Sequence, residues 1–195
     1  MTTTTVHRSF RLSSPKPKDI YHQLKGWTAT DRLAASNKLR SAMRRDSGLK
    51  KAAEATAETI RELMVAKSVS IVLLDDRGYR DLVNIGQLAR GEHRFPEDEP
   101  APANYYPAAT TRLLGGESYV TIGSSRQLVT EYRKLRPGER IGSVMGVPVM
   151  HAEEIWGEVF ILRDANAPGF TDTDLDMACE LTAQFGMQLP VLLRA

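Results

Sequence analysis

Between residues 19 and 66 the apolar residues recur every three or four positions, a spacing that predicts amphipathic helices. The Asp46-Ser47-Gly48 triplet favours a break between two such helices. The stripe of the first helix is thin and rich in alanine, so this helix should pack against another surface. The apolar positions of the two stripes are Ala35, Leu39, Ala42 and Met43, then Leu49, Ala53, Ile60 and Met64.

The following segment has the pattern of an antiparallel hairpin. Residues 68–74 are β-branched and apolar, residues 75–78 carry a turn signal in which Gly78 can take a positive φ, and residues 79–85 return as a second strand. The acidic, proline-rich stretch 91–102 predicts a loop. After it the pattern predicts a short helix within 104–114 that ends at Gly115-Gly116, a short strand within 117–122 and a helix within 127–135.

The last third of the chain predicts a second hairpin. Residues 141–150 form a strand whose Pro148 lacks a backbone donor and favours an edge or a bulge, and residues 155–163 form its partner. Strict alternation along the partner strand places Ile155, Gly157, Val159 and Ile161 on one face and Trp156, Phe160 and Leu162 on the other.

The final helix has a clear start signal. Thr171 is a good N-cap, Asp174 lies three residues later where a carboxylate can meet free amides, and Phe170 and Leu175 occupy the positions of a hydrophobic staple. A core stripe then continues until Pro190. The remaining positions of this stripe are Ala178, Thr182, Phe185 and Leu189.

The order of elements predicts an α+β fold with an antiparallel sheet, terminal helices packed on one face, and loops and short helices over the other. We expect three parts: a flexible tail at 1–18, a basic helical extension at 19–47 and a folded domain at 48–195.

The closing segment carries a family resemblance. The stretches Ser143-Val-Met-Gly-Val-Pro-Val-Met150, Ile155-Trp-Gly-Glu-Val-Phe-Ile-Leu162 and Pro168-Gly-Phe-Thr-Asp-Thr-Asp-Leu175 resemble the closing half of a GAF domain, and residues 49–85 are similar to its opening half. The resemblance implies a GAF/PAS-like sheet and a sensory or regulatory role. It does not specify a ligand.

Charge is divided unevenly along the chain. From His7 to Lys51, twelve Lys and Arg residues stand against three acids, whereas the remainder has fourteen against twenty-one. Basic helices that pack on an acidic body, within one chain or across a homodimer, account for this division. The alternative is a transcriptional regulator that binds nucleic acid through its basic extension. The candidate contact residues for either role are Arg32, Lys38, Arg40, Arg44 and Arg45.

Catalysis has weak support in the sequence, so we expect a protein that is not an enzyme. Redox enzymes of the GAF fold use paired cysteines, and Cys179 is the one cysteine of this chain. Haem ligation through His93 or His151 is disfavoured because isolated loop histidines are usually solvated. No cofactor is evident, and no His, Cys or Asp cluster has the spacing of metal ligands.

The resemblance implies that a small molecule lies between the sheet and the central segment. Aromatic and cationic side chains in that segment suit a flat or anionic ligand. These candidates are Tyr105, Tyr106, Arg112, Tyr119, Arg126, Tyr132 and Arg133. The sequence also has no apolar run long enough for a membrane helix and no signal core at its start, which favours a cytoplasmic location and no membrane partner. We therefore expect a homodimeric sensory GAF protein that binds a small molecule or a protein partner and signals through its helices.

Overall fold

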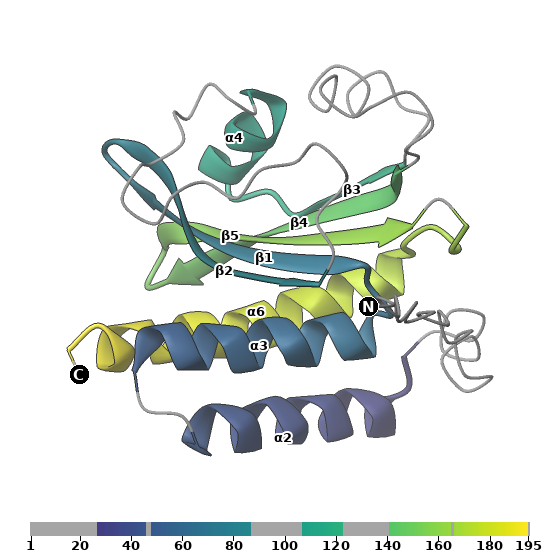
Figure 1. The fold of residues 1–195 in the computed structure, drawn as a ribbon, viewed down its shortest axis with the longest axis horizontal. Coiled ribbons are helices and arrows are strands. Elements are labelled where there is room, and N and C mark those ends of the chain that lie inside the picture. Colours follow the sequence, from purple (N-terminus) through teal and green to yellow (C-terminus); the bar gives the residue numbers. More distant parts are fainter. Residues whose placement is uncertain (1–26, 46–47, 87–106, 123–140, 165, 195) are drawn as a thin grey trace, which may run out of the picture.

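The computed structural model describes residues 27–45, 48–86, 107–122, 141–164 and 166–194. These residues form an antiparallel five-stranded sheet with helices beneath one face and a short helix above the other, which confirms the expected α+β architecture (Figure 1). The tail at 1–18, the loop at 91–102 and the helix at 127–135 lie outside the described residues. No helix in the described part of the chain is long and apolar enough to cross a membrane.

The sheet joins two hairpins that are far apart in the sequence. Its strand order is β2-β1-β5-β4-β3, and every pairing is antiparallel. The first hairpin turns at Gly78, whose φ of 128° is the positive value that the turn signal predicted. The central pairing of β1 with β5 unites the first and last strands. The strands are β1 (Ser68–Asp75), β2 (Gly78–Gly86), β3 (Tyr119–Ile122), β4 (Ile141–His151) and β5 (Glu154–Asp164).

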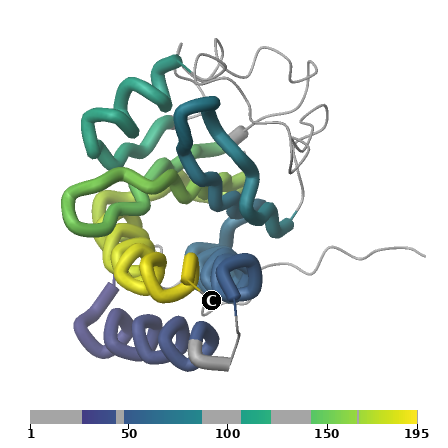
Figure 2. The backbone as a smooth tube through the Cα atoms, turned by 90° about the vertical axis from the view of Figure 1, so that its left-hand side faces the viewer, coloured from purple at the N-terminus to yellow at the C-terminus, as the bar shows by residue number. Residues whose placement is uncertain are grey.

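Three helices form two layers on one side of the sheet. Helices α3 (Leu49–Leu63) and α6 (Asp172–Leu192) lie side by side against the sheet, and α2 (Ala29–Arg45) lies beneath both (Figures 1 and 2). The break between α2 and α3 falls where the sequence predicted it, since Gly48 has a φ of 98° immediately before α3. The thin stripe of α2 therefore finds a packing surface within its own chain.

The start of α6 confirms the capping prediction. The Thr171 hydroxyl accepts from the Asp174 amide, and the Asp174 carboxylate accepts from the Thr171 amide, so the two residues form a complete capping box. The core stripe ends at Leu189, as predicted, while the helix itself continues through Pro190 to Leu192. Pro190 lies in the last turn, where the missing N–H removes one hydrogen bond without stopping the helix.

The predicted alternation along β5 also needs a correction. Met150 of β4 pairs with Ile155 and Val149 pairs with Gly157, so Trp156 is an extra residue in a β-bulge. As a result Trp156 packs against the core beneath the sheet, whereas Ile155 packs on the opposite face. Pro148 behaves as predicted, because β3 pairs with β4 only from Ser143 to Gly146 and leaves β4 beside Pro148 without β3 as a neighbour.

Candidate functional site

The sheet face beneath α4 (Pro107–Leu114), which we call the loop face, carries polar residues among apolar ones. Directly opposed residues in neighbouring strands share a face, so the register identifies the members of this surface. One row across the sheet runs through Tyr119, Gly146, Phe160, Ser70 and Asn84. A second row runs through Pro148, Glu158, Val72 and Asp81, and a third through Thr121, Val144, Leu162 and Ser68.

Helix α4 is held over the loop face by its buried side. Leu113 is fully buried and packs with Val72 and Tyr79, while the Tyr79 hydroxyl bonds to Thr110 Oγ1 at 2.7 Å. The helix ends as the Gly115-Gly116 pair predicted. Gly116 takes a φ of 69°, and the Glu117 amide donates to the Arg112 carbonyl at 2.9 Å.

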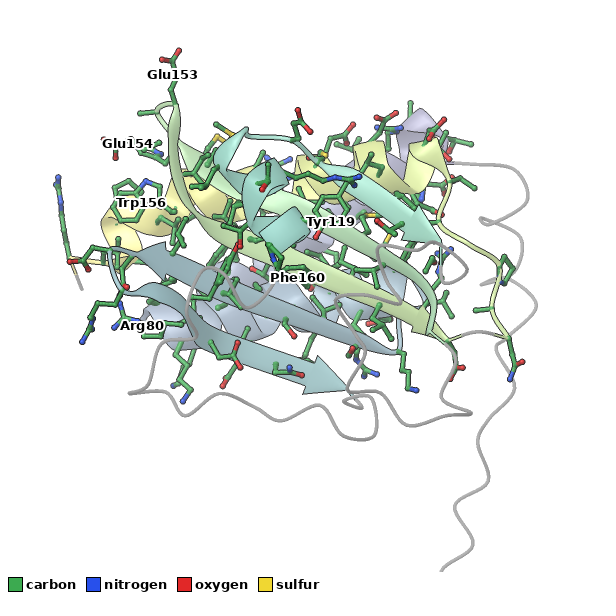
Figure 3. The ribbon with its side chains drawn as sticks, turned by 90° about the horizontal axis from the view of Figure 1, so that it is seen from above. Arg80, Tyr119, Glu153, Glu154, Trp156 and Phe160 are labelled. Atoms are coloured by element: carbon green, nitrogen blue, oxygen red, sulfur yellow. The ribbon has the colours of Figure 1, made fainter. Side chains whose placement is uncertain are left out.

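Arg112 and Tyr119, two of the predicted ligand contacts, lie together at this site. The Arg112 guanidinium carbon lies 4.8 Å from the centroid of the Tyr119 ring, a cation–π distance. Figure 3, which looks onto the loop face, shows Tyr119 and Phe160 near the middle of the sheet beside α4. The other five predicted contacts, Tyr105, Tyr106, Arg126, Tyr132 and Arg133, lie outside the described residues.

Glu158 is the buried carboxylate of the loop face. Its side chain has no exposed surface, and it lies beside the Tyr119 ring over Gly146. A Cβ at Gly146 would stand 2.3 Å from Glu158 Oε1 and 2.4 Å from the ring carbons of Tyr119. The absence of a side chain at Gly146 therefore creates the space in which the carboxylate and the ring approach each other. A buried carboxylate is costly unless charges or hydrogen-bond donors face it.

Sequence reasoning missed Glu158, Phe160 and Thr121 as site residues. Glu158 did carry a signal, because it is an acid in the middle of a buried apolar strand and shares the alternation of Phe160 and Leu162. Thr121 lies two residues after Tyr119 and so faces the same side of the sheet. Its buried hydroxyl makes no hydrogen bond with the residues that the structure describes. The identity of these positions depends on strand pairing, which the sequence pattern alone did not provide.

Two of the basic residues of α2 form ion pairs with acids of the same chain. Arg32 pairs with Glu180 and Asp176 of α6, and the Lys38 ammonium lies 2.6 Å from a Glu62 oxygen of α3. Arg40 is exposed, and Arg44 and Arg45 lie in the last turn of α2. These contacts are intramolecular, and they match the interpretation of basic helices packed on an acidic body within one chain.

The residues considered for chemistry are scattered. Cys179 is half-buried, and its thiol donates to Ser118 Oγ at 3.3 Å. His151 is half-buried at the end of β4, and His93 lies outside the described residues. Glu153 and Glu154 are exposed where β4 turns into β5 (Figure 3). Among the described residues no group of three or more His, Cys, Asp or Glu side chains could hold a metal ion.

A second buried polar cluster lies at the opposite end of β5, on the helix side. Arg163 is 1 % exposed and donates through Nε and Nη2 to the Met64 carbonyl and through Nη1 to Asp174 Oδ2 at 3.3 Å. Its guanidinium stacks 4.1 Å from the Phe170 ring centroid. Burial lowers the pKa of Arg163 from its ordinary value, while the Asp174 charge and hydrogen bond act in the opposite direction. This cluster ties the end of α3 and the start of α6 to the sheet.

The fold is similar to several solved GAF domains. The GAF domain of an Acinetobacter phosphoenolpyruvate-protein phosphotransferase superimposes with a TM-score of 0.66 at 17% identity, covering 86% of this chain and 96% of that one. The GAF/HD domain protein of Geobacter sulfurreducens gives 0.62 at 18% identity, over 75% and 95%. The far-red absorbing dark state of JSC1_58120g3 with bound biliverdin gives 0.64 at 12% identity, over 82% and 99%. No curated protein matches the sequence.

The match to a known protein family covers most of the chain. Residues 48–189 match the GAF domain family, which covers the interval from the residue before α3 to the last turns of α6 and leaves α2 outside. This agrees with the resemblance that the closing hairpin and the Thr171 helix start carried. The chain therefore belongs to the GAF family of sensory and regulatory domains, with an N-terminal helix before the domain.

Proposed function

We propose that this protein is a non-catalytic sensor whose GAF domain binds a small molecule on the loop face, between the sheet and α4. The observation that carries the proposal is the group formed by Glu158, Tyr119 and Arg112. It brings a buried carboxylate, an aromatic ring and a cation from three separate elements onto one face. Packing of a sheet does not require such groups. A structure of similar fold holds biliverdin, which supports a ligand role for the domain.

The chemistry of the group favours a flat ligand with two polar ends. Tyr119 and Phe160 offer ring surfaces, Glu158 accepts hydrogen bonds from N–H or ammonium groups, and Arg112 can pair with an acidic group. Binding of this kind uses the described residues without a nucleophile, a metal ion or an acid/base pair, and so we propose a binding role and no reaction.

Native mass spectrometry of freshly purified protein, with an absorbance spectrum, tests the proposal. We expect a bound molecule that is retained by the wild type and lost from Tyr119→Leu and Glu158→Gln. The matched controls are Glu153→Gln and Glu154→Gln, which change exposed acids at the far turn and should retain it. If no molecule co-purifies, a thermal-shift screen of flat amines and amino acids should find ligands that Glu158→Gln no longer binds. Failure of both experiments would contradict the proposal.

We further propose that output passes through the helices, with a homodimer as the signalling form. Sedimentation of the full-length protein and of a variant lacking residues 1–46 at micromolar concentration tests this idea, and monomers in both cases would contradict it. The nucleic-acid alternative is weakened because carboxylates of the same chain already pair with Arg32 and Lys38. Steeply salt-dependent DNA binding that disappears on the same truncation would restore it.

A further inference from the structure

Helix α2 is held to the GAF domain by a small apolar contact. Its buried side chains are Ala35, Leu39 and Met43, and Trp27 packs partly buried just before the helix starts. The helix forms an outer layer on α3 and α6 and does not touch the sheet face that they cover (Figures 1 and 2). Elements with few buried apolar contacts open before the rest of a fold.

The polar rim of this contact adds little to its stability. Lys38 pairs with Glu62, which is 71 % exposed, and Arg32 pairs with Glu180, which is 45 % exposed. Solvent-exposed ion pairs of this kind contribute weakly and are screened by salt. The Ser36 hydroxyl accepts from Gln184 Nε2 at 2.7 Å, a neutral bond that is only partly buried. The rim therefore sets the register of α2 along α6 more than it holds the helix in place.

The start of α2 is different, because it reaches a buried carboxylate. The Trp27 indole donates to Asp174 Oδ1 at 3.1 Å, and Asp174 is 2 % exposed. The other oxygen, Oδ2, accepts from the Thr171 amide at 3.0 Å and from Arg163 Nη1 at 3.3 Å. One carboxylate thus joins the start of α2, the cap of α6 and the end of β5. Through Arg163 it also joins the Met64 carbonyl at the end of α3.

We infer that α2 can detach from α3 and α6, and that the position of the Asp174 carboxylate controls this detachment. The Trp27 bond forms only while the Thr171 cap and Arg163 hold the carboxylate in place. A shift of β5 or of the start of α6 moves the Asp174 oxygen that accepts from Trp27, and so allows α2 to detach. Glu158 of the loop face and Arg163 of this junction both belong to β5. Release uncovers the sides of α3 and α6 that α2 shields.

Hydrogen exchange on the full chain tests whether α2 is a separate unit. We expect the amides of residues 29–45 to exchange at least tenfold faster than the most protected amides of α3 and β1. Removing the Trp27 donor with Trp27→Phe should speed exchange in α2 about tenfold, because a bond to a charged acceptor is lost. Trp156→Phe changes the other tryptophan of the chain and is the matched control, with no effect on α2.

A change at the start of α6, on the Asp174 side of the Trp27–Asp174 bond, tests whether Asp174 controls the attachment of α2. Thr171→Ala removes the hydroxyl that accepts from the Asp174 amide and leaves the Thr171 amide in place, so it loosens the residue that carries the carboxylate without touching α2. It should speed exchange in α2 about fivefold, the factor expected for a lost N-cap. Thr111→Ala removes an exposed hydroxyl from α4, on the other face of the sheet, and should leave α2 unchanged. Exchange of α2, α3 and β1 as one cooperative unit would overturn the inference. So would wild-type exchange in α2 when Trp27→Phe or Thr171→Ala is present.

Discussion

The two faces of the sheet are built from different chemistry, although the same five strands supply both. The helix side presents an apolar surface to α3 and α6, formed by fully or nearly fully buried side chains. Its members are Val69, Ile71, Val83, Met145, Val147, Val149, Val159 and Ile161. The loop face carries Glu158, Tyr119 and Thr121 beside Phe160 and Val144. The helix side therefore stabilises the fold by apolar burial, whereas the loop face carries the polar and aromatic residues that we propose contact a ligand.

The distinction has a physical basis. Burial of apolar side chains drives folding, so one continuous apolar face is enough to fix a sheet against two helices. A buried acid or hydroxyl adds a desolvation cost and therefore marks a position with another role. The exceptions on the helix side include Arg163, whose bonds to Met64 and Asp174 are structural, and its neighbour Ser143, whose hydroxyl accepts from the Phe170 amide.

Truncation on the helix side should be the most damaging. Ile161→Ala removes a fully buried side chain from the main core and should lower the free energy of unfolding by about 4 kcal/mol. Leu162→Ala, the next residue and on the loop face, should cost about 2 kcal/mol, because among the described residues its cluster contains only Val144 and Phe160. Urea unfolding of both variants measures the difference. Equal losses would remove the energetic contrast between the faces.

Filling the space at Gly146 should be the next largest effect. Gly146→Ala places a methyl group against Glu158 and the Tyr119 ring, so we expect a cost of about 1–3 kcal/mol and displacement of both side chains. Gly169→Ala is the control, because a Cβ there meets nothing within 4 Å, and its stability should stay within about 0.5 kcal/mol of wild type. A Gly146→Ala protein as stable as the control would show that Tyr119 and Glu158 can move aside freely.

The attachment of α4 should give a smaller effect. Tyr79→Phe removes the hydroxyl that bonds to Thr110 and should cost about 1 kcal/mol while it speeds amide exchange in α4. A double-mutant cycle with Thr110→Val isolates this bond from other contacts of the two side chains. Additive losses in the cycle would mean that the bond does not hold α4 over the loop face.

Local signals in the sequence were sufficient for the elements that depend on short-range chemistry. The Thr171–Asp174 capping box, the Gly78 turn and the Gly115-Gly116 helix end are each decided within a few residues, and all three occur as predicted. The resemblance of the closing hairpin to GAF domains was also correct. Arg112 and Tyr119 lie together on the loop face, and their contact with a ligand stays a prediction.

Features that depend on strand pairing could not be predicted in this way. The bulge at Trp156 arises from the register of β5 against β4, and it reversed the expected faces of Ile155 and Trp156. Glu158 reaches Tyr119 only because β3 pairs with the outer side of the β4–β5 hairpin, although β3 is distant from that hairpin in the sequence. The partner of α2 was left open between this chain and a second copy, since a basic helix and an acidic surface can pair either way.

The most direct test of the central claim compares two buried charges on the same strand. Glu158 faces the loop side and Arg163 faces the helix side, and both are almost fully buried. Urea unfolding of Glu158→Gln and Arg163→Gln measures what each charge contributes to the fold. We predict that Glu158→Gln stays within about 1 kcal/mol of wild type, whereas Arg163→Gln loses about 3–5 kcal/mol because Asp174 remains buried without its cation. A loss of about 3 kcal/mol or more in Glu158→Gln would contradict the account, because the loop face would then be part of what holds the fold together.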